Sequence, residues 1–326
     1  MEDVLRPIYQ ERASQSRTLG ILMVERGSDY SPETDLFDVI LFVIVREGEE
    51  AVFIKHYVFG EKSASLYVVD EHRVKEWVLL GSNRKVMNWL LNGKILFERN
   101  EYIGQLRQRL LQFPEEERKV KMGIEFAKLV RRYIEGRSFF EKDQWLDAYN
   151  HVLHALHHLA RLSIIEHGFY PEVTVWNQVK QIEPQIYKLY AELVGSEEPL
   201  DKRLQLLFLA SDFFIHSKLK QGVSHLIHVL EKREASWSMA DLLNEKELEV
   251  YGVDLEILLE FLVVKHLISV KKIATKGQGV FHRHYVVEKN KEKVLTFKNA
   301  HDIFLIVAAE MWRRLKTKLV DIGFVM

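Results

Sequence analysis

Residues 25–45 read ERGSDYSPETDLFDVILFVIV, and this stretch decides the fold. The pair Gly27-Ser28 follows one β-branched apolar run, residues 18–25, and Asp38 opens the next, residues 38–45. Apolar runs of this length bounded by turn residues are typical of buried strands. Glycine lets a backbone approach a phosphate closely, and a serine with free N–H groups can cradle it. We therefore expect two strands joined by a loop in which Gly27 and Ser28 either bind a phosphate or form a plain turn.

Carboxylates at the head of the second strand predict a magnesium site, because oxygen ligands suit Mg²⁺ and the ion can bridge phosphates. Asp38 opens the strand, Asp35 lies three residues before it, and Leu36 occupies the position two before. Residues i and i+2 of a strand share a face, so a regular strand would point Asp35 away from Asp38. Asp35 and Asp38 are the predicted metal ligands, and a bulge or irregular backbone after Pro32-Glu33 would be needed to bring them together.

The rest of residues 1–100 predicts a mixed sheet with a few helices, an α+β domain. Further β-branched runs continue the sheet at residues 51–59 and 64–70, and a short strand at 94–99 follows the turn at Asn92-Gly93. Helical patterns occupy residues 3–12, 71–80 and 84–91.

The hydrophobic period changes near Glu101. From there to residue 219, long segments place apolar residues at i, i+3, i+4 and i+7, which predicts amphipathic helices. Gly168 ends one of them, and Pro171 follows three residues later. We expect residues 101–219 to form a helical bundle domain.

Residues 220–326 predict a winged helix followed by one more helix. The expected order is helix, short strand, two helices and a hairpin. In the hairpin, basic residues form a wing that could bind DNA or RNA phosphates, or could be no more than a solvated basic hairpin: Lys271, Lys272, Lys276 and Arg283. The helix before the wing carries Asp254, Glu256 and Glu260, which would weaken phosphate binding. The last helix, about residues 300–319, has a broad apolar face, so we expect it to pack on another domain or to form a homodimer contact.

The order of these features resembles the nucleotidyltransferase superfamily, and in particular the kanamycin nucleotidyltransferase type. The phrase GKILFERNEY, residues 93–102, is similar to a short strand after a glycine turn in that family, and ALHHLARLSIIEHG with VWNQVKQ resembles its helical substrate domain. The resemblance covers about residues 15–215. It implies Mg²⁺-dependent transfer of a nucleoside monophosphate from a nucleoside triphosphate to an acceptor, with His157, His158 and Arg161 in the substrate groove.

The chain departs from the family pattern at the metal ligands. Active members usually carry two aspartates at i and i+2, and a third carboxylate on a later strand. Here the third position falls near Leu66 or Tyr67, so Asp70 is the nearest candidate for the third catalytic carboxylate, with Glu71 beside it. Losing a ligand from such a site removes most of the catalysis. Two hypotheses therefore stand: an active enzyme that uses Mg²⁺ and a nucleoside triphosphate, or an inactive nucleotide- or nucleic-acid-binding regulatory protein without that cofactor.

Three histidines, His151, His154 and His158, share one face of a predicted helix. The spacing allows a metal site, but partly buried histidines in a groove are the preferred interpretation, because the helix lacks the carboxylate pattern of known histidine sites.

We expect a bacterial, cytoplasmic protein, and the composition supports the cytoplasmic location. There is no cysteine, residues 1–17 are charged without an apolar run, and the longest apolar runs are far shorter than a bilayer span. No membrane partner is expected. The predicted partners are a nucleotide, nucleic acid and a second copy of the chain. A net charge of −1 means that any attraction to nucleic acid must be local.

Overall fold

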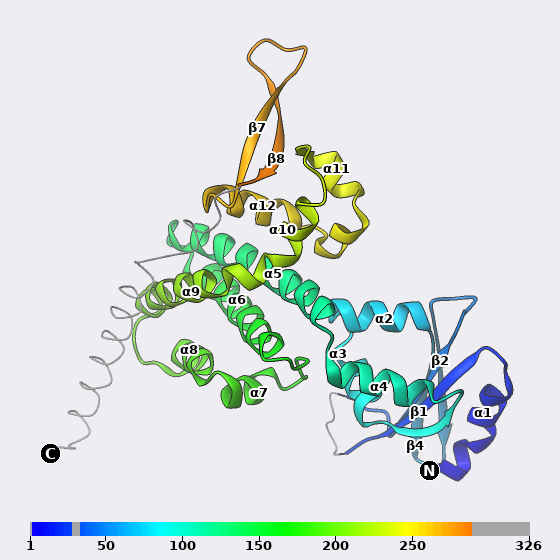
Figure 1. The fold of residues 1–326 in the computed structure, drawn as a ribbon. Coiled ribbons are helices and arrows are strands. Elements are labelled where there is room, and N and C mark those ends of the chain that lie inside the picture. The colour runs from blue at the N-terminus through cyan, green and yellow to red at the C-terminus, as the bar shows by residue number, and fades with distance from the viewer. Residues whose placement is uncertain (1, 28–32, 289–326) are drawn as a thin grey trace, which may run out of the picture. The chain divides into compact units, whose positions relative to one another are not determined.

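The computed structural model describes residues 2–27 and 33–288, which form two compact units (Figure 1). The first unit comprises residues 1–117 and 168–174, and the second comprises residues 118–167 and 175–326. Ser28 and the helix expected at residues 300–319 lie outside the described residues.

The first unit is built on a five-stranded mixed sheet with the strand order β3-β4-β2-β1-β5. Strands β2 and β4 run parallel, and every other neighbouring pair is antiparallel. All seven residues of β2 are buried, as its uninterrupted apolar sequence predicts. The strands are β1 (Thr18–Glu25), β2 (Val39–Val45), β3 (Val52–Phe59), β4 (Lys62–Asp70) and β5 (Lys94–Glu98).

Helices cover both faces of this sheet. Helix α1 (Glu2–Ser14) packs Leu5 and Tyr9 on one face. The opposite face carries the larger cluster, in which Trp89 is fully buried among residues of β2 and β4. That face is covered by α2 (Glu71–Leu80), α3 (Arg84–Asn92) and α4 (Tyr102–Gln112).

Helix α4 extends the first unit past the boundary expected at residue 100. It packs Ile103 and Leu110 into the cluster around Trp89, and Tyr170 joins the same cluster. The apolar face of α4 is therefore buried against the sheet, which is why the compact unit continues to residue 117.

The second unit combines a helical bundle with the winged helix. Tyr251 packs so closely on α5 that a side-chain carbon at Gly123 would collide with its ring and hydroxyl, and His225 contacts the Tyr251 hydroxyl at 3.0 Å. The bundle helices are α5 (Glu115–Phe140), α6 (Trp145–Glu166), α7 (Val175–Ile182), α8 (Pro184–Gly195), α9 (Leu200–Gly222) and α10 (Ser224–Leu230).

The winged helix has the predicted order of elements. Its three-stranded antiparallel sheet has the order β6-β8-β7, and the long β7–β8 hairpin projects from the helices of this unit (Figure 1). The elements are β6 (Trp237–Ser238), α11 (Met239–Asn244), the 3₁₀ helix η1 (Lys246–Tyr251), α12 (Asp254–Val264), β7 (Ile268–Ala274) and β8 (Phe281–Val287). The α+β class, with a mixed sheet, a helical region and a C-terminal helix-turn-helix, is confirmed. Among the described helices, none is both long and apolar enough to cross a bilayer.

Candidate functional site

Asp38 lies just before β2 with both carboxylate oxygens engaged by the protein. Arg26 Nη2 donates to Oδ1 at 2.7 Å. The backbone N–H of Ser63 donates to Oδ2 at 2.8 Å, and the Ser63 hydroxyl lies 3.3 Å from the same oxygen. The backbone completes the arrangement, since Arg26 N–H donates to the Asp38 carbonyl at 2.9 Å and Asp38 N–H to the Ser63 carbonyl at 3.0 Å. Three neighbouring strand ends thus meet at this one carboxylate.

The same contacts lower the pKa of Asp38. The largest influence is the hydrogen bond from the Ser63 backbone, and the nearby Arg26 charge acts in the same direction. The carboxylate is therefore ionised at neutral pH, and its charge is already compensated within the protein. A metal ion at this carboxylate would have to compete with a guanidinium and a backbone donor.

Asp35 lies on the irregular backbone that the sequence allowed for, but this backbone does not join it to Asp38. Asp35 and Leu36 both have positive φ, 52° and 73°. The Asp35 carboxylate forms an ion pair with Lys85 of α3, while the Leu36 carbonyl accepts a hydrogen bond from Arg26 at 3.2 Å. The two predicted ligands are neutralised separately, Asp35 by Lys85 and Asp38 by Arg26.

Asp70 lies at the far end of the sheet from Asp38. In the parallel β2–β4 register, Val39 pairs with Ala64 and Val45 with Asp70, so about seven strand residues, or roughly 20 Å, separate Asp70 from Ser63 and Asp38. Its carboxylate accepts hydrogen bonds from His72 N–H at 2.7 Å, as the N-cap of α2, and from Gly48 N–H at 3.3 Å. The predicted grouping of Asp70 with Asp35 and Asp38 is corrected by this register.

Gly27 lies just after the end of β1. A side-chain carbon built there would meet no atom of the described residues within 4 Å, so nothing in the described part of the chain requires glycine at this position. The three predicted carboxylates do not fit Mg²⁺, because Asp35, Asp38 and Asp70 each bind different protein groups and do not converge on one point.

The groove residues of α6 surround a buried glutamate of α5. His158 Nδ1 lies 2.7 Å from Glu125 Oε2, and Arg161 Nη1 lies 3.8 Å from the same oxygen. Burial, the largest influence, raises the pKa of Glu125, but the His158 hydrogen bond and charge outweigh it, and the pKa is lowered. His157 faces a different way, with its ring centroid 4.9 Å from that of Trp176, which stacks on Tyr190. His158 and Arg161 therefore hold α6 to α5, whereas His157 meets aromatic residues of α7 and α8.

The histidine face of α6 does not gather a metal site in the described part of the chain. His151 lies 3.2 Å from Glu135, apart from the His158–Glu125 pair, and burial lowers the pKa of His154. The described residues with metal-ligand spacing are Glu166, His167 and Glu183. Lys218 forms an ion pair with Glu166 and lies 3.0 Å from Glu183, so a protein cation already neutralises both carboxylates of that group.

The wing presents basic side chains while α12 presents acidic ones. Lys271, Lys272 and Lys276 are exposed. Arg283 is held at 2.9 Å from Glu260 of α12, and the Tyr285 hydroxyl donates to the other Glu260 oxygen at 3.0 Å. Glu260, Arg283 and Tyr285 line a groove of about 1040 Å³ between β8, α12 and the start of α11, formed by residues 238–241, 256, 260 and 281–285.

Asp254 does not face this groove. It is buried at the start of α12 in an ion pair with Arg131 of α5, which attaches the winged helix to the bundle. The acidic residues of α12 that border the wing groove are therefore Glu256 and Glu260.

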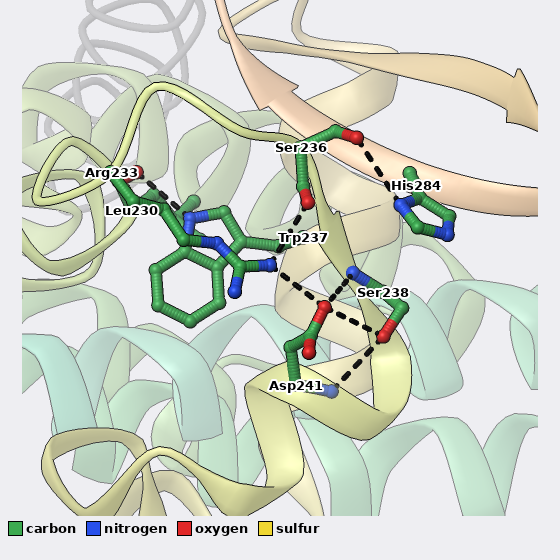
Figure 2. A network of polar contacts seen from close by, with 7 residues as sticks. All are labelled: Leu230, Arg233, Ser236, Trp237, Ser238, Asp241 and His284. Carbon is green, nitrogen blue, oxygen red and sulfur yellow. Dashed lines mark hydrogen bonds and ion pairs between the residues drawn. The ribbon is translucent and has the colours of Figure 1, made fainter.

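A polar network at the edge of the groove holds the base of the wing, and local sequence patterns do not predict most of its contacts. Figure 2 shows Arg233 over the Trp237 ring, 3.8 Å from its centroid, while Arg233 Nη2 donates to Asp241 Oδ2 at 2.7 Å. Asp241 and Ser238 form a reciprocal capping box at the start of α11. Ser236 Oγ lies 3.2 Å from His284 Nδ1 of β8. The Ser-x-x-Asp spacing of the capping box was a readable signal, but the Arg233–Trp237 contact depends on the folded turn.

Comparisons with known proteins follow the same division of the chain. Residues 1–118 match the Nucleotidyltransferase-like family, residues 119–218 the YgxA-like substrate binding domain and residues 224–287 a helix-turn-helix domain. The chain is 53% identical over 289 residues to the uncharacterized protein YgxA of Bacillus subtilis (strain 168), which covers 89% of this chain and 98% of that protein. A crystal structure of a nucleotidyltransferase-like protein from Exiguobacterium sibiricum 255-15 matches with a TM-score of 0.76 and 41% identity, over 88% of this chain and 99% of that one. The chain therefore belongs to the family of YgxA-like proteins, which join a nucleotidyltransferase-like domain to a helical domain and a helix-turn-helix domain.

Proposed function

We propose that this protein is a non-catalytic member of the nucleotidyltransferase-like group that binds nucleic acid through the wing of its winged helix. The observation that carries the proposal is the contrast within the winged helix: Lys271, Lys272 and Lys276 are exposed on the hairpin, while Glu256 and Glu260 occupy α12. Phosphates attract the first set and are repelled by the second. The wing, rather than α12, then makes the first contact with the nucleic acid backbone.

The loss of catalysis is supported by the contacts of the three candidate carboxylates. Asp38 is bound by Arg26 and Ser63, Asp35 by Lys85, and Asp70 caps α2 at the other end of β4. Metal-dependent nucleotidyl transfer requires carboxylates that converge on one ion. The sheet then serves as a scaffold, and a nucleotide, if one is bound, would lie at the end of β1 beside Gly27.

Binding through the wing has a characteristic salt dependence. Each lysine that neutralises a phosphate releases counterions, so the affinity falls steeply as salt rises. Arg283 differs from the lysines because Glu260 already holds it. We expect Arg283 to contribute only when a phosphate replaces Glu260.

Fluorescence anisotropy of the full chain with labelled duplex DNA and duplex RNA, over a range of salt concentrations, tests the proposal. The variant K271A/K272A/K276A should lose most of the affinity and flatten the salt dependence. The variant K142A/K188A/K220A removes the same charge from exposed bundle positions and should bind like the wild type. The proposal fails if the wild type binds neither nucleic acid at low salt, or if both variants bind equally well.

The second candidate is Mg²⁺-dependent transfer from a nucleoside triphosphate. It is favoured by the match of residues 1–118 to the Nucleotidyltransferase-like family. Calorimetric titration with ATP or GTP in the presence of Mg²⁺, followed by an assay for pyrophosphate release, distinguishes the two candidates. Heat without pyrophosphate supports a nucleotide-binding scaffold, pyrophosphate release supports the enzyme, and the absence of both removes the nucleotide from the proposal.

A further inference from the structure

We infer that two copies of this chain pair through strand β3, edge to edge and antiparallel, with His56 of one copy opposite His56 of the other. Strand β3 is the outer strand of the sheet, at the end of the order β3-β4-β2-β1-β5. Among the described strands only β4 pairs with it. The pairing would join two five-stranded sheets into one.

The backbone of β3 is regular, and its outer N–H and C=O groups point away from β4. Its register with β4 runs from Val52 opposite Val69 to Phe59 opposite Lys62 without a bulge. The Ala51 carbonyl accepts from Asp70 N–H at 3.1 Å, and the direction of backbone groups alternates along a strand. The N–H and C=O groups of Ile54, His56 and Val58 therefore point away from β4, along the open edge.

The side chains of this edge are unusually apolar for a strand in contact with water. Phe53 is 40% exposed, Ile54 47% and Val58 81%. Proteins usually protect an edge strand with proline, charged residues, a bulge or a covering loop. The sequence VFIKHYVF has no proline and a single full charge, Lys55. An exposed apolar edge of this kind favours pairing with another strand.

The occupant that fits the edge is a second β3, because the sequence is self-complementary about His56. In an antiparallel pair with twofold symmetry at His56, residues at equal distances on either side face each other. Ile54 then lies opposite Val58, Phe53 opposite Phe59 and Lys55 opposite Tyr57. Apolar residues meet apolar ones, and Lys55 meets an aromatic ring, as it already does within the chain, where Lys55 Nζ lies 5.7 Å from the Tyr57 ring centroid.

The backbone alternation is compatible with this centre, and the side-chain pairs favour it over its neighbour. With His56 on the axis, the outward groups of Ile54 face those of Val58, and the outward groups of His56 face each other, so each outward N–H and C=O of these residues obtains a partner. A centre shifted to Lys55 would place the lysines opposite each other and Ile54 opposite His56, which replaces an apolar pair by unfavourable ones.

Sedimentation velocity on the 326-residue chain tests whether β3 forms the dimer contact. We expect the wild type to be a dimer and V58K to be a monomer, because the change places a charge opposite Ile54 twice in each dimer. Val58 is exposed, so V58K should keep the circular dichroism spectrum of the wild type. The control V264K alters another exposed valine, 71% exposed at the end of α12, and should remain a dimer. A monomeric wild type, or a V58K that still dimerises, overturns the inference.

Cysteine cross-linking tests the register. The chain contains no cysteine, so a single introduced thiol can form a disulfide only between two copies. Directly opposed residues of an antiparallel pair have Cα atoms about 5.5 Å apart or closer, within disulfide range. H56C should give a cross-linked dimer under mild oxidation on non-reducing gels, whereas K55C, which the twofold axis places opposite Tyr57, should give far less. If K55C cross-links as well as H56C, or if neither does, the His56-centred pairing is wrong.

Discussion

Arg26 Nη2 lies 2.7 Å from Asp38 Oδ1, so an arginine at the end of β1 holds the carboxylate that a metal-dependent nucleotidyltransferase would offer to its ion. The contact is 17% exposed on the Asp38 side and is supported by Ser63 on the neighbouring strand. In this chain the Asp38 carboxylate therefore has a structural role: it links the ends of β1, β2 and β4.

Replacement of Asp38 by asparagine should lower the melting temperature at neutral pH. The folded-state pKa of Asp38 is lowered, so the stabilisation is present above the unfolded value of about 3.9 and is lost as the pH falls through the folded value. The difference in melting temperature between wild type and D38N should therefore shrink as the pH falls below about 4. Calorimetric scans from pH 7 to pH 3 measure it, and a difference that grows on acidification would contradict the assigned contacts.

Glu125→Gln should destabilise the second unit by about 2 kcal/mol, because the buried carboxylate loses its charge-assisted hydrogen bond to His158. Since the pKa of Glu125 is lowered in the folded state, this effect should be full at neutral pH and should diminish in acid. The control E141Q removes the exposed partner of Arg137 and should change the free energy of unfolding by less than about 0.5 kcal/mol. Urea denaturation followed by circular dichroism compares the two, and equal effects would disprove the structural role of Glu125.

Gly123→Ala should destabilise the packing of the winged helix on the bundle. An added methyl group would collide with Tyr251, and such overpacking costs about 1–3 kcal/mol. Gly195→Ala, at the end of α8, meets no atom within 4 Å and should be neutral or slightly stabilising. Thermal unfolding of both variants provides the measurement. A neutral G123A would mean that η1 can move away from α5 without cost.

Glu260→Gln should strengthen nucleic acid binding by about threefold to tenfold, since it frees Arg283 and removes an acidic group beside the wing. Glu256 lines the same groove, but Arg283 pairs with Glu260, so E256Q serves as a matched loss of charge with a smaller expected gain. Anisotropy titrations at a fixed salt concentration compare the two variants. Equal gains would show that only the overall charge of the groove matters, and that the Arg283–Glu260 pair has no specific effect.

Local patterns in the sequence were sufficient to predict most of the helices and strands. The apolar run at residues 39–45 predicted a fully buried strand, and the order of helices, short strand and hairpin predicted the winged helix. These features depend on hydrophobic period and turn residues, which are properties of neighbouring positions along the chain. The spacing of Asp35 and Asp38 allowed an irregular backbone after Glu33; Asp35 and Leu36 do have positive φ, but this backbone does not bring the two carboxylates together.

The contacts of the candidate site depended on strand order and direction instead. Asp70 would approach Asp38 only if β4 ran antiparallel to β2, but β3 turns back at Gly60 and pairs on the outer side of β4, which leaves β4 parallel to β2. The sequence by itself determined which segments become strands and helices, since burial of apolar faces acts locally. Only the tertiary structure decided that Arg26 and Ser63 meet at Asp38, because that meeting requires three strand ends, distant in the sequence, to be placed in one register.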